Sequence, residues 1–225
     1  MKRGIISIIW GNSANLPLDR LLASTRKHHP ELPHQIIEVS TELTGSHAFQ
    51  EKSRMLDHSP FEETLYLDAD TIVLGKLNFG FEQAIAYGLA MTLCENPWAR
   101  RYPKIFAGDE VEYNTGVVFF TRQHAALFEA WKQNARELDS ELVFVKAGVP
   151  VSMASNDQGT FAAAVRNLGI NPFILPANWN FRPKWQKSFF GPLKIWHDYS
   201  DPPDAIHRIN DYYSGSNSII QYHRL

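Results

Sequence analysis

The first forty residues alternate between a continuous apolar run and an amphipathic one. Residues 4–10 (GIISIIW) are apolar almost throughout, which is typical of a strand in a parallel sheet that helices cover on both faces. Residues 16–29 repeat apolar side chains at helical spacing, and Pro30 ends the run. A second apolar strand follows at residues 35–39. The chain is therefore predicted to open with a strand, a helix and a strand.

The same alternation continues along the rest of the chain. Strands are expected near residues 65–74, 88–94, 114–121, 171–175 and 193–197, and helices over residues 46–57, 123–138 and 155–169. Ser155 or Asn156 is expected to cap the last of these helices, and Gly169 to end it. This order predicts an α/β fold with a mostly parallel central sheet flanked by helices, whose ligands lie at the carboxyl ends of the strands. One domain is expected over residues 1–199, with residues 200–225 forming a helix and tail packed on it.

Composition and charge exclude several classes of protein. A chain of 225 residues with 44% hydrophobic and 20% charged residues is ordinary for a globular protein with a sizeable core. The net charge of -2, without any block of Lys and Arg, argues against a nucleic-acid partner. Cys94 is the single cysteine, which excludes an internal disulfide and suits a reducing compartment.

Neither long apolar stretch is suited to targeting or to membrane insertion. Residues 4–10 lack a following cleavage site, and residues 81–94 (FEQAIAYGLAMTLC) are too short and too polar to cross a bilayer. We therefore expect a cytoplasmic protein without a transmembrane segment. The sequence leaves its oligomeric state open.

The stretch LYLDADTIVL, residues 65–74, places two carboxylates at the end of an apolar strand. Asp68 and Asp70 are two residues apart, so in a strand both side chains point to the same side. Two like charges so close together call for a cation between them, and a divalent metal ion is the usual one. The alternative is an Asp-rich turn whose side chains bond to nearby backbone N–H groups.

An Asp-x-Asp-x-Thr motif at a strand end is used by two classes of enzyme. In phosphatases of the haloacid-dehalogenase type, which DADTI resembles, the first Asp (here Asp68) attacks phosphate. In nucleotide-sugar glycosyltransferases the carboxylates hold a metal ion on a diphosphate. The phosphatase motif usually lies on the first strand and is completed by a late acidic pair, whereas Asp68 lies on the third predicted strand and residues 108–112 (GDEVE) do not supply such a pair.

Residues 4–199 resemble the GT-A-fold glycosyltransferases of family 8, the group of glycogenin and the lipopolysaccharide galactosyltransferases. The resemblance runs through Lys52, TLYLDADTIVLGKL (64–77), YNTGVVFF (113–120), NDQGTF (156–161), NWNFRP (178–183) and IWHD (195–198), in that order. It implies a GT-A fold and a hexosyltransferase that uses a nucleoside diphosphate sugar, by the habit of the family a uridine diphosphate sugar, with retention of anomeric configuration. The acceptor and the sugar are not implied.

The resemblance also implies a metal site formed by Asp68, Asp70 and His197. Oxygen ligands suit Mg2+ or Mn2+, and the nitrogen ligand favours Mn2+. Without the resemblance, His197 reads as a strand-end histidine bonded to Asp198. The chain departs from the family after His197, where WHDYSDPPDAIHR replaces the usual Gly and Lys-Pro-Trp that clamp the diphosphate. The charged residues that could supply a replacement are Lys184, Lys187, His207 and Arg208.

The remaining residues assigned to the donor site come from several segments. The full set for the nucleotide sugar is Trp10, Gly11, Asn12, Lys52, Asp68, Ala69, Asp70, Glu95, Asn114, Thr115, Gly116, Asp157 and Gln158. Lys52 corresponds to a basic residue that reaches the donor in relatives, although Arg54 is chemically equivalent. Asp157 and Gln158 are the catalytic candidates, with Asp157 assigned to donor positioning and catalysis left largely to metal and proximity.

Each of these residues also has a purely structural interpretation. Trp10 fits the edge of the sheet core, Asn114 an Asx-turn, and Asp157 a helix cap. The aromatic residues of segment 179–199 fit either the core or an acceptor site. Besides the transferase, a phosphatase and a non-catalytic sugar-nucleotide binder remain as alternatives.

Overall fold

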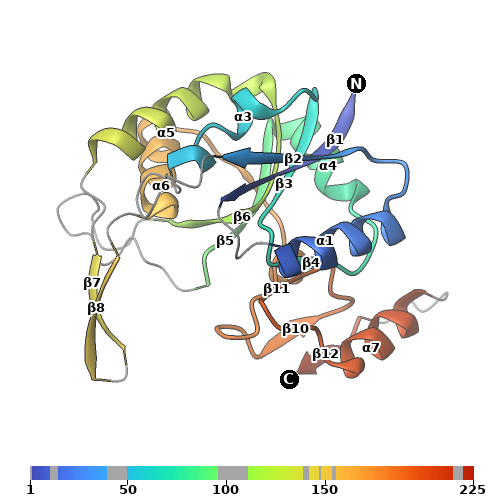
Figure 1. Ribbon diagram of the computed structural model, residues 1–225. Helices are drawn as coiled ribbons and strands as arrows, with labels where there is room; N and C mark the ends of the chain where they lie inside the picture. Colours follow the sequence, from blue (N-terminus) through green and yellow to red (C-terminus); the bar gives the residue numbers. More distant parts are fainter. Residues whose placement is uncertain are drawn as a thin grey trace.

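The protein is built around a six-stranded sheet that is parallel except for one strand. A computed structural model describes residues 2–10, 15–39, 50–95, 111–138, 142–146, 148–153, 156–214 and 220–225. The sheet has the order β2-β1-β3-β6-β5-β9 (Figure 1). Its strands are β1 (Arg3–Trp10), β2 (His34–Val39), β3 (Glu63–Leu67), β5 (Leu89–Leu93), β6 (Tyr113–Thr121) and β9 (Phe173–Ile174). Only β6 runs antiparallel to its neighbours β3 and β5, so the predicted mostly parallel sheet is confirmed.

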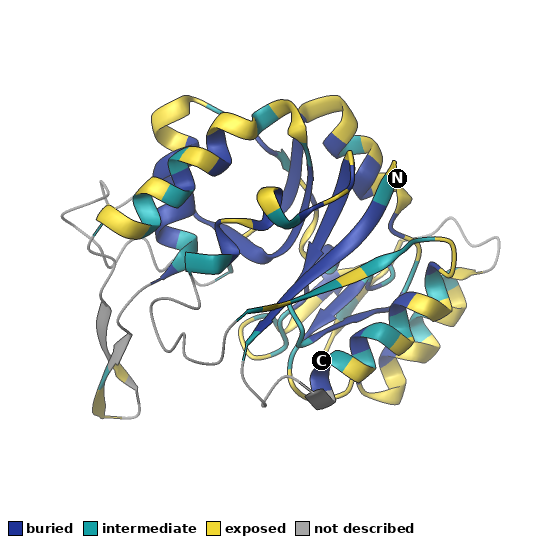
Figure 2. Ribbon diagram, turned by 45° about the horizontal axis from the view of Figure 1, so that its top comes forward, coloured by how far each residue is buried: buried dark blue, intermediate teal, exposed yellow. Residues whose placement is uncertain are grey.

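Helices cover both faces of this sheet, as the continuous apolar strands predict. On one face, α5 (Ala125–Glu137) and α6 (Asp157–Leu168) pack over Val118 and Phe120 of β6. On the other, α1 (Asn15–His28) and α4 (Asn78–Tyr87) pack over Val117 and Phe119. Successive residues of β6 thus enter two different cores, because side chains alternate across a strand. Figure 2 shows the buried strands between helices whose outer sides are exposed.

The helix ends follow the predicted local signals. The side chain of Asn156 accepts hydrogen bonds from the backbone N–H groups of Gln158 and Gly159, which identifies it as the N-cap of α6. Gly169 ends α6 with φ 61, a left-handed conformation that favours glycine. Pro30 follows the end of α1 at His28.

The predicted helix over residues 46–57 is wrong in part. Residues 46–49 lie outside the described residues, residues 50–52 are helical, and a turn at residues 53–54 separates them from α3 (Met55–His58). The predicted strand over residues 65–74 is likewise divided into β3 and β4 (Thr71–Val73) by a turn that contains both aspartates. Asp68 and Asp70 therefore converge in a turn rather than along one strand.

The segment after residue 176 brings the C-terminal part of the chain to this turn. A 3-10 turn, η4 (Ala177–Trp179), precedes β10 (Ser188–Phe190) and β11 (Ile195–His197). Strand β11 pairs antiparallel with β4, so His197 lies opposite Thr71. Phe181, Phe189 and Trp196 are buried here in a third core cluster, which favours the core interpretation for these aromatics, whereas Tyr199 is exposed.

The chain ends with α7 (Asp204–Ser214) and β12 (Tyr222–Arg224), which pairs with β10. Ile206 of α7 is fully buried against the third core cluster, and the side chain of Asn210 bonds to the carbonyl groups of Leu74 and Leu193. A separate hairpin, β7 (Leu142–Lys146) with β8 (Val149–Met153), projects from the body in Figure 1. Among the described helices, none combines the length and the apolar character needed to span a bilayer.

Candidate active site

The turn Asp68–Asp70 is held in place by backbone contacts on both sides. The N–H of Asp68 donates to the carbonyl of Gly116 on β6 at 2.9 Å, and the Thr71 hydroxyl donates to the carbonyl of Asp68 at 2.7 Å. The N–H of Asp198 donates to the carbonyl of Asp70 at 3.0 Å. The turn is therefore fixed between β6 and the end of β11, and Ala69 lies between its two carboxylates.

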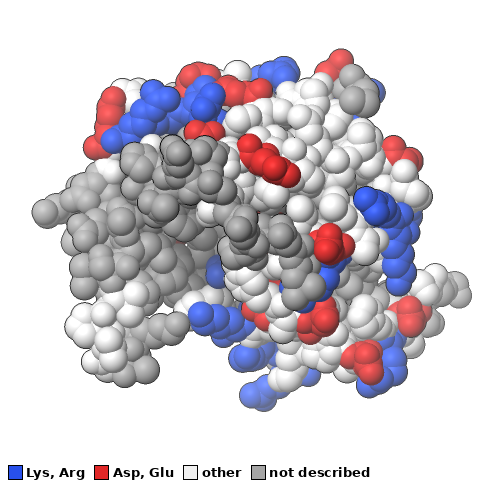
Figure 3. Space-filling view, viewed as in Figure 1, with Lys and Arg blue, Asp and Glu red and all other residues white. Residues whose placement is uncertain are grey.

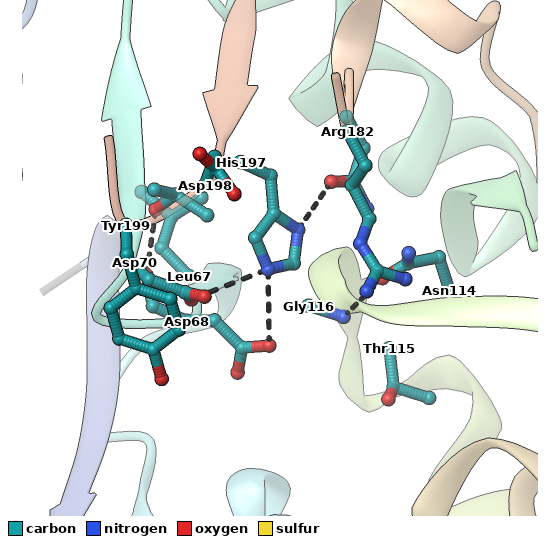
Figure 4. A network of polar contacts seen from close by, with 12 residues as sticks. Leu67, Asp68, Asp70, Asn114, Thr115, Gly116, Arg182, His197, Asp198 and Tyr199 are labelled. Carbon is teal, nitrogen blue, oxygen red and sulfur yellow. Dashed lines mark hydrogen bonds and ion pairs between the residues drawn. The ribbon is translucent and has the colours of Figure 1, made fainter. Parts of the chain in front are cut away.

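His197 completes a cluster with the two aspartates (Figure 4). Its Nε2 lies 3.3 Å from Oδ1 of Asp70 and 3.8 Å from Oδ2 of Asp68. One ligand atom from each of the three residues lies within 4.8 Å of the others. The structural alternative for His197 was a hydrogen bond to Asp198. Instead, Nδ1 of His197 lies 2.7 Å from Oδ1 of Asn180.

The cluster has the chemistry of a divalent cation site. Burial alone would raise the pKa of Asp70, but the neighbouring His197 lowers the pKa to about 2, so this carboxylate is charged. Gly116 leaves the space beside the cluster open: a Cβ there would lie 2.4 Å from Cε1 of His197 and 2.6 Å from Oδ2 of Asp68. Two carboxylates, one imidazole and open space between them fit Mn2+ or Mg2+.

Lys52 is the buried cation of this site. Its Nζ lies 2.9 Å from Oδ1 of Asp68 and 3.0 Å from Oδ2 of Asp157. Burial would lower the pKa of Lys52, but Asp157 and Asp68 raise it well above the ordinary lysine value. Arg54, its chemical rival, pairs with Glu51 and Asp57 on the surface. The structure thus places Lys52, and not Arg54, between the carboxylates.

Asp157 faces the same lysine from the first residue of α6. The Thr115 hydroxyl donates to Oδ2 of Asp157 at 2.6 Å. Burial raises the pKa of Asp157, but Lys52 and the Thr115 hydrogen bond outweigh this effect and lower the pKa below its ordinary value. The N-cap of α6 is Asn156, not Asp157, but the carboxylate of Asp157 lies in the first turn, where it favours the helix dipole as expected.

Gln158 follows Asp157 and carries a buried amide oxygen. Its Oε1 has no hydrogen-bond partner among the residues that the structure describes. A buried carbonyl oxygen without a partner loses the free energy of a hydrogen bond, which a ligand hydroxyl group could restore.

Asn114 and Glu95 belong to a second polar group beside the cluster. Oδ1 of Asn114 accepts the N–H of Gly116 at 2.9 Å, which is the Asx-turn that the sequence allows. Its Nδ2 donates to Oε2 of Glu95 at 3.4 Å, and Arg182 binds Oε1 of Glu95 at 2.8 Å. This group connects β5, β6 and the segment after η4.

Three residues of the site were not assigned from the sequence. Tyr66 donates its hydroxyl to Oδ1 of Asp68 at 2.7 Å, and burial and Asp68 raise the pKa of Tyr66 well above its ordinary value. Its spacing of two residues from Asp68 was a usable signal. Asn180 and Arg182 lie within NWNFRP, but only the three-dimensional arrangement gives them partners.

Other predicted residues lie away from the cluster or outside the described chain. Trp10 ends β1 and packs partly buried against the core on the side of α5 and α6. Gly11 and Asn12 lie outside the described residues. The four proposed replacements for the clamp are exposed: Lys184, Lys187, His207 and Arg208. Lys184 lies over the Trp185 ring, and Lys187 donates to the carbonyl of Pro183. None of these four is seen in contact with the cluster within the described part of the chain.

No protein-family model and no curated protein match the chain, but solved structures do. Mouse xyloside xylosyltransferase 1 in its apo form aligns with a TM-score of 0.58 at 14% identity, over 90% of this chain and 99% of that one. The galactosyltransferase LgtC with donor and acceptor sugar analogues aligns with a TM-score of 0.60 at 13% identity, over 88% of this chain and 87% of that one. The apo glycosyltransferase GlyE of Streptococcus pneumoniae TIGR4 aligns with a TM-score of 0.53 at 16% identity, over 81% of this chain and 47% of that one.

All three structures are named as glycosyltransferases. At such low sequence identity, the structural alignments show a common fold and nothing further. The sheet order, the turn that contains Asp68 and Asp70, and the return of His197 are the features described above. The chain therefore has the GT-A fold of nucleotide-sugar glycosyltransferases, and in structure as in its motifs it resembles family 8.

Proposed function

We propose that this protein is a metal-dependent hexosyltransferase that takes its sugar from a nucleoside diphosphate donor, a uridine diphosphate sugar by family resemblance, and retains anomeric configuration. The observation that carries the proposal is the convergence of Asp68, Asp70 and His197 at the carboxyl end of β3 in a GT-A fold. Ligands of such sheets bind at this edge. The acceptor is left open.

The charges of the site support a bound divalent cation. Four carboxylates, those of Asp68, Asp70, Asp157 and Glu95, face two cations, Lys52 and Arg182. This leaves two negative charges, which one divalent cation neutralises. Mn2+ or Mg2+ held by the two aspartates and His197 would supply Lewis-acid stabilisation of the charge on the departing diphosphate.

The protein's own side chains provide the positioning. Lys52 is fixed by Asp68 and Asp157 and adds positive charge beside the donor position. Asp157, held by Lys52 and Thr115, is restrained as a positioning group would be. Oε1 of Gln158, which has no partner among the described residues, is available to a sugar hydroxyl. We therefore assign positioning of the donor to Asp157, Gln158 and the strand end Asn114–Gly116. We attribute the acceleration of sugar transfer to proximity and charge stabilisation.

Neither alternative is favoured. The GT-A likeness argues against a phosphatase in which Asp68 attacks phosphate, because that reading rested on the motif alone. The altered segment after His197 is the feature that would fit a non-catalytic binder. The contacts among the three metal-binding candidates and Lys52 favour the transferase.

The test is release of free sugar from uridine diphosphate galactose, glucose and xylose, each with Mn2+, Mg2+ or chelator. We expect slow, metal-dependent hydrolysis of one of the two hexose donors rather than of the pentose donor. We also expect a loss of at least about 100-fold in Asp68→Asn, because one removed charge-stabilising group typically costs that much. Asp57→Asn is the matched control, since Asp57 lies in surface ion pairs on α3. Hydrolysis of a phosphomonoester with no turnover of any donor would contradict the proposal.

A further inference from the structure

Asn180 is a buried amide that faces the back of His197. It is 1% exposed, and its Oδ1 lies 2.7 Å from Nδ1 of His197. The backbone on both sides is fixed: the N–H of Asn180 bonds to the carbonyl of Ala177, and the N–H of His197 bonds to the carbonyl of Phe181 at 2.9 Å. The two side chains are thus held against each other by segments that cannot easily separate.

This contact determines which nitrogen of the ring carries the proton. An amide oxygen only accepts hydrogen bonds, so Nδ1 of His197 must be the donor. Because Asn180 holds the Nδ1 proton, Nε2 is the nitrogen that gives up its proton and presents a lone pair when a cation binds. That lone pair faces Asp70 and Asp68 at 3.3 and 3.8 Å, an arrangement that requires a cation between the three groups.

We infer that Asn180 is the positioning residue that fixes His197 in the Nδ1-H tautomer and thereby makes Nε2 a metal ligand. The inference rests on the metal site of the proposed function and adds a residue that lies outside both the Asp-x-Asp motif and the ligand cluster. Outer groups that bind the second nitrogen of a ligating histidine orient the ring and strengthen it as a ligand.

The opposite orientation of the Asn180 amide makes a different prediction. With Nδ2 donating to Nδ1, the ring would carry its proton on Nε2 and direct it at the two carboxylates, which gives a hydrogen-bonded site that does not bind metal. In the observed orientation Nδ2 has no partner among the described residues, and in the reversed one the buried oxygen would have none. The ring tautomer therefore distinguishes the two orientations.

The tautomer can be measured by 15N NMR of the histidine ring nitrogens in protein saturated with Mg2+, a diamagnetic ion that leaves the signals sharp. His197→Gln identifies the signal of His197 among the nine histidines. We expect Nδ1 to be the protonated nitrogen in the wild type and in Asn180→Asp, which keeps an acceptor. In Asn180→Ala we expect this preference to be lost.

Metal affinity gives the second readout. Titration of Mn2+ should show a loss of about 10- to 100-fold in Asn180→Ala and near wild-type affinity in Asn180→Asp. Asn178→Ala is the matched control, because Asn178 lies in the same segment but bonds to the carbonyl of Pro192. If Asn180 were merely structural, replacing it would change thermal stability but not the tautomer. The Mn2+ affinities of Asn180→Ala and Asn180→Asp would then be the same.

A protonated Nε2 in the wild type, or equal Mn2+ affinity in Asn180→Ala and wild type, would overturn the inference. The NMR measurement uses Mg2+ but neither sugar nucleotide nor turnover. Failure of donor hydrolysis with the expected tautomer would therefore count against the proposed function alone, and the reversed tautomer with normal hydrolysis against this inference alone.

Discussion

Lys52 and Lys132 each bind two carboxylates, one pair inside the site and the other on the surface. Lys52 contacts Asp68 and Asp157 at 2.9 and 3.0 Å, and Lys132 contacts Asp57 and Glu129 at 2.9 and 2.6 Å. The side chains of the first pair of carboxylates are 22% and 9% exposed, whereas those of the second are 38% and 66% exposed. Figure 3 shows the mixed charges on the face that carries α3 and α5.

The difference between the two sites is the cost of losing a partner. At the surface, water replaces a lost ion pair, so the pair contributes little to stability. In the interior a removed partner leaves an uncompensated charge. Similar distances can therefore accompany very different energies, and burial distinguishes a functional cluster from a solvated helix face.

The largest expected effect comes from removal of the buried cation. Lys52→Met leaves Asp68 and Asp157 without it, and we expect the free energy of unfolding in chelator to fall by about 3–5 kcal/mol. Lys132→Met is the matched change, with an expected loss of about 1 kcal/mol or less that shrinks as salt is added. Denaturant unfolding measures both, and equal losses would contradict the comparison.

His34 is a partly buried titratable group that sharpens the comparison, because no carboxylate among the described residues pairs with it. Burial, followed by Arg26, lowers the pKa of His34 to about 4, and its ring contacts the Ser7 hydroxyl at 3.0 Å. As the pH falls from about 6.5 toward 4, the unfolded chain binds a proton that the folded chain excludes. Stability should therefore be fully present above pH 6.5 and fall by about 3 kcal/mol over this window.

The measurement for His34 is unfolding by denaturant at several pH values, with the wild type compared with His34→Gln. The difference between their slopes isolates His34 from the other titrating groups. A loss of stability in this window that is the same in both proteins would show that His34 does not cause it.

The substitution Gly116→Ala, which fills the open space beside the cluster, is expected to have the smallest effect on stability. Gly116→Ala places a Cβ within 2.6 Å of Asp68 and His197, so we expect a stability loss of about 1–3 kcal/mol and Mn2+ affinity at least about tenfold weaker. Gly75→Ala is the control, since its Cβ would meet nothing closer than 3.4 Å. Unchanged Mn2+ affinity in Gly116→Ala, measured by titration, would mean that the cation does not use this space.

The sequence predicted the parts of the fold that depend on local patterns. Residues 4–10 and 114–121 are apolar enough to be recognised as strands, and Asn156 and Gly169 mark the ends of α6. It missed α4, β10 and β12, and it merged α3 with the helical turn before it. These elements are short or weakly patterned, and tertiary contacts decide them.

The residues of the site also divide into those that the sequence predicted and those that it did not. Asp68, Asp70 and His197 were predicted to meet and do so, because the motif and the resemblance mark each of them. Asn180 and Arg182 lie in NWNFRP, a segment that the resemblance includes, but the resemblance assigns them no role. Their partners are fixed only when the chain after η4 returns to β4 and β6. Contacts between segments far apart in the sequence leave little trace in a single chain.

The central claim is that Asp68, Asp70 and His197 bind one divalent cation. The most direct test is titration of Mn2+ followed by the electron paramagnetic resonance signal of the free ion, in wild type, Asp70→Asn and Asp57→Asn. We expect one bound Mn2+ in wild type and in Asp57→Asn, with affinity at least about tenfold weaker in Asp70→Asn. No binding by the wild type, or equal binding by Asp70→Asn, would contradict it.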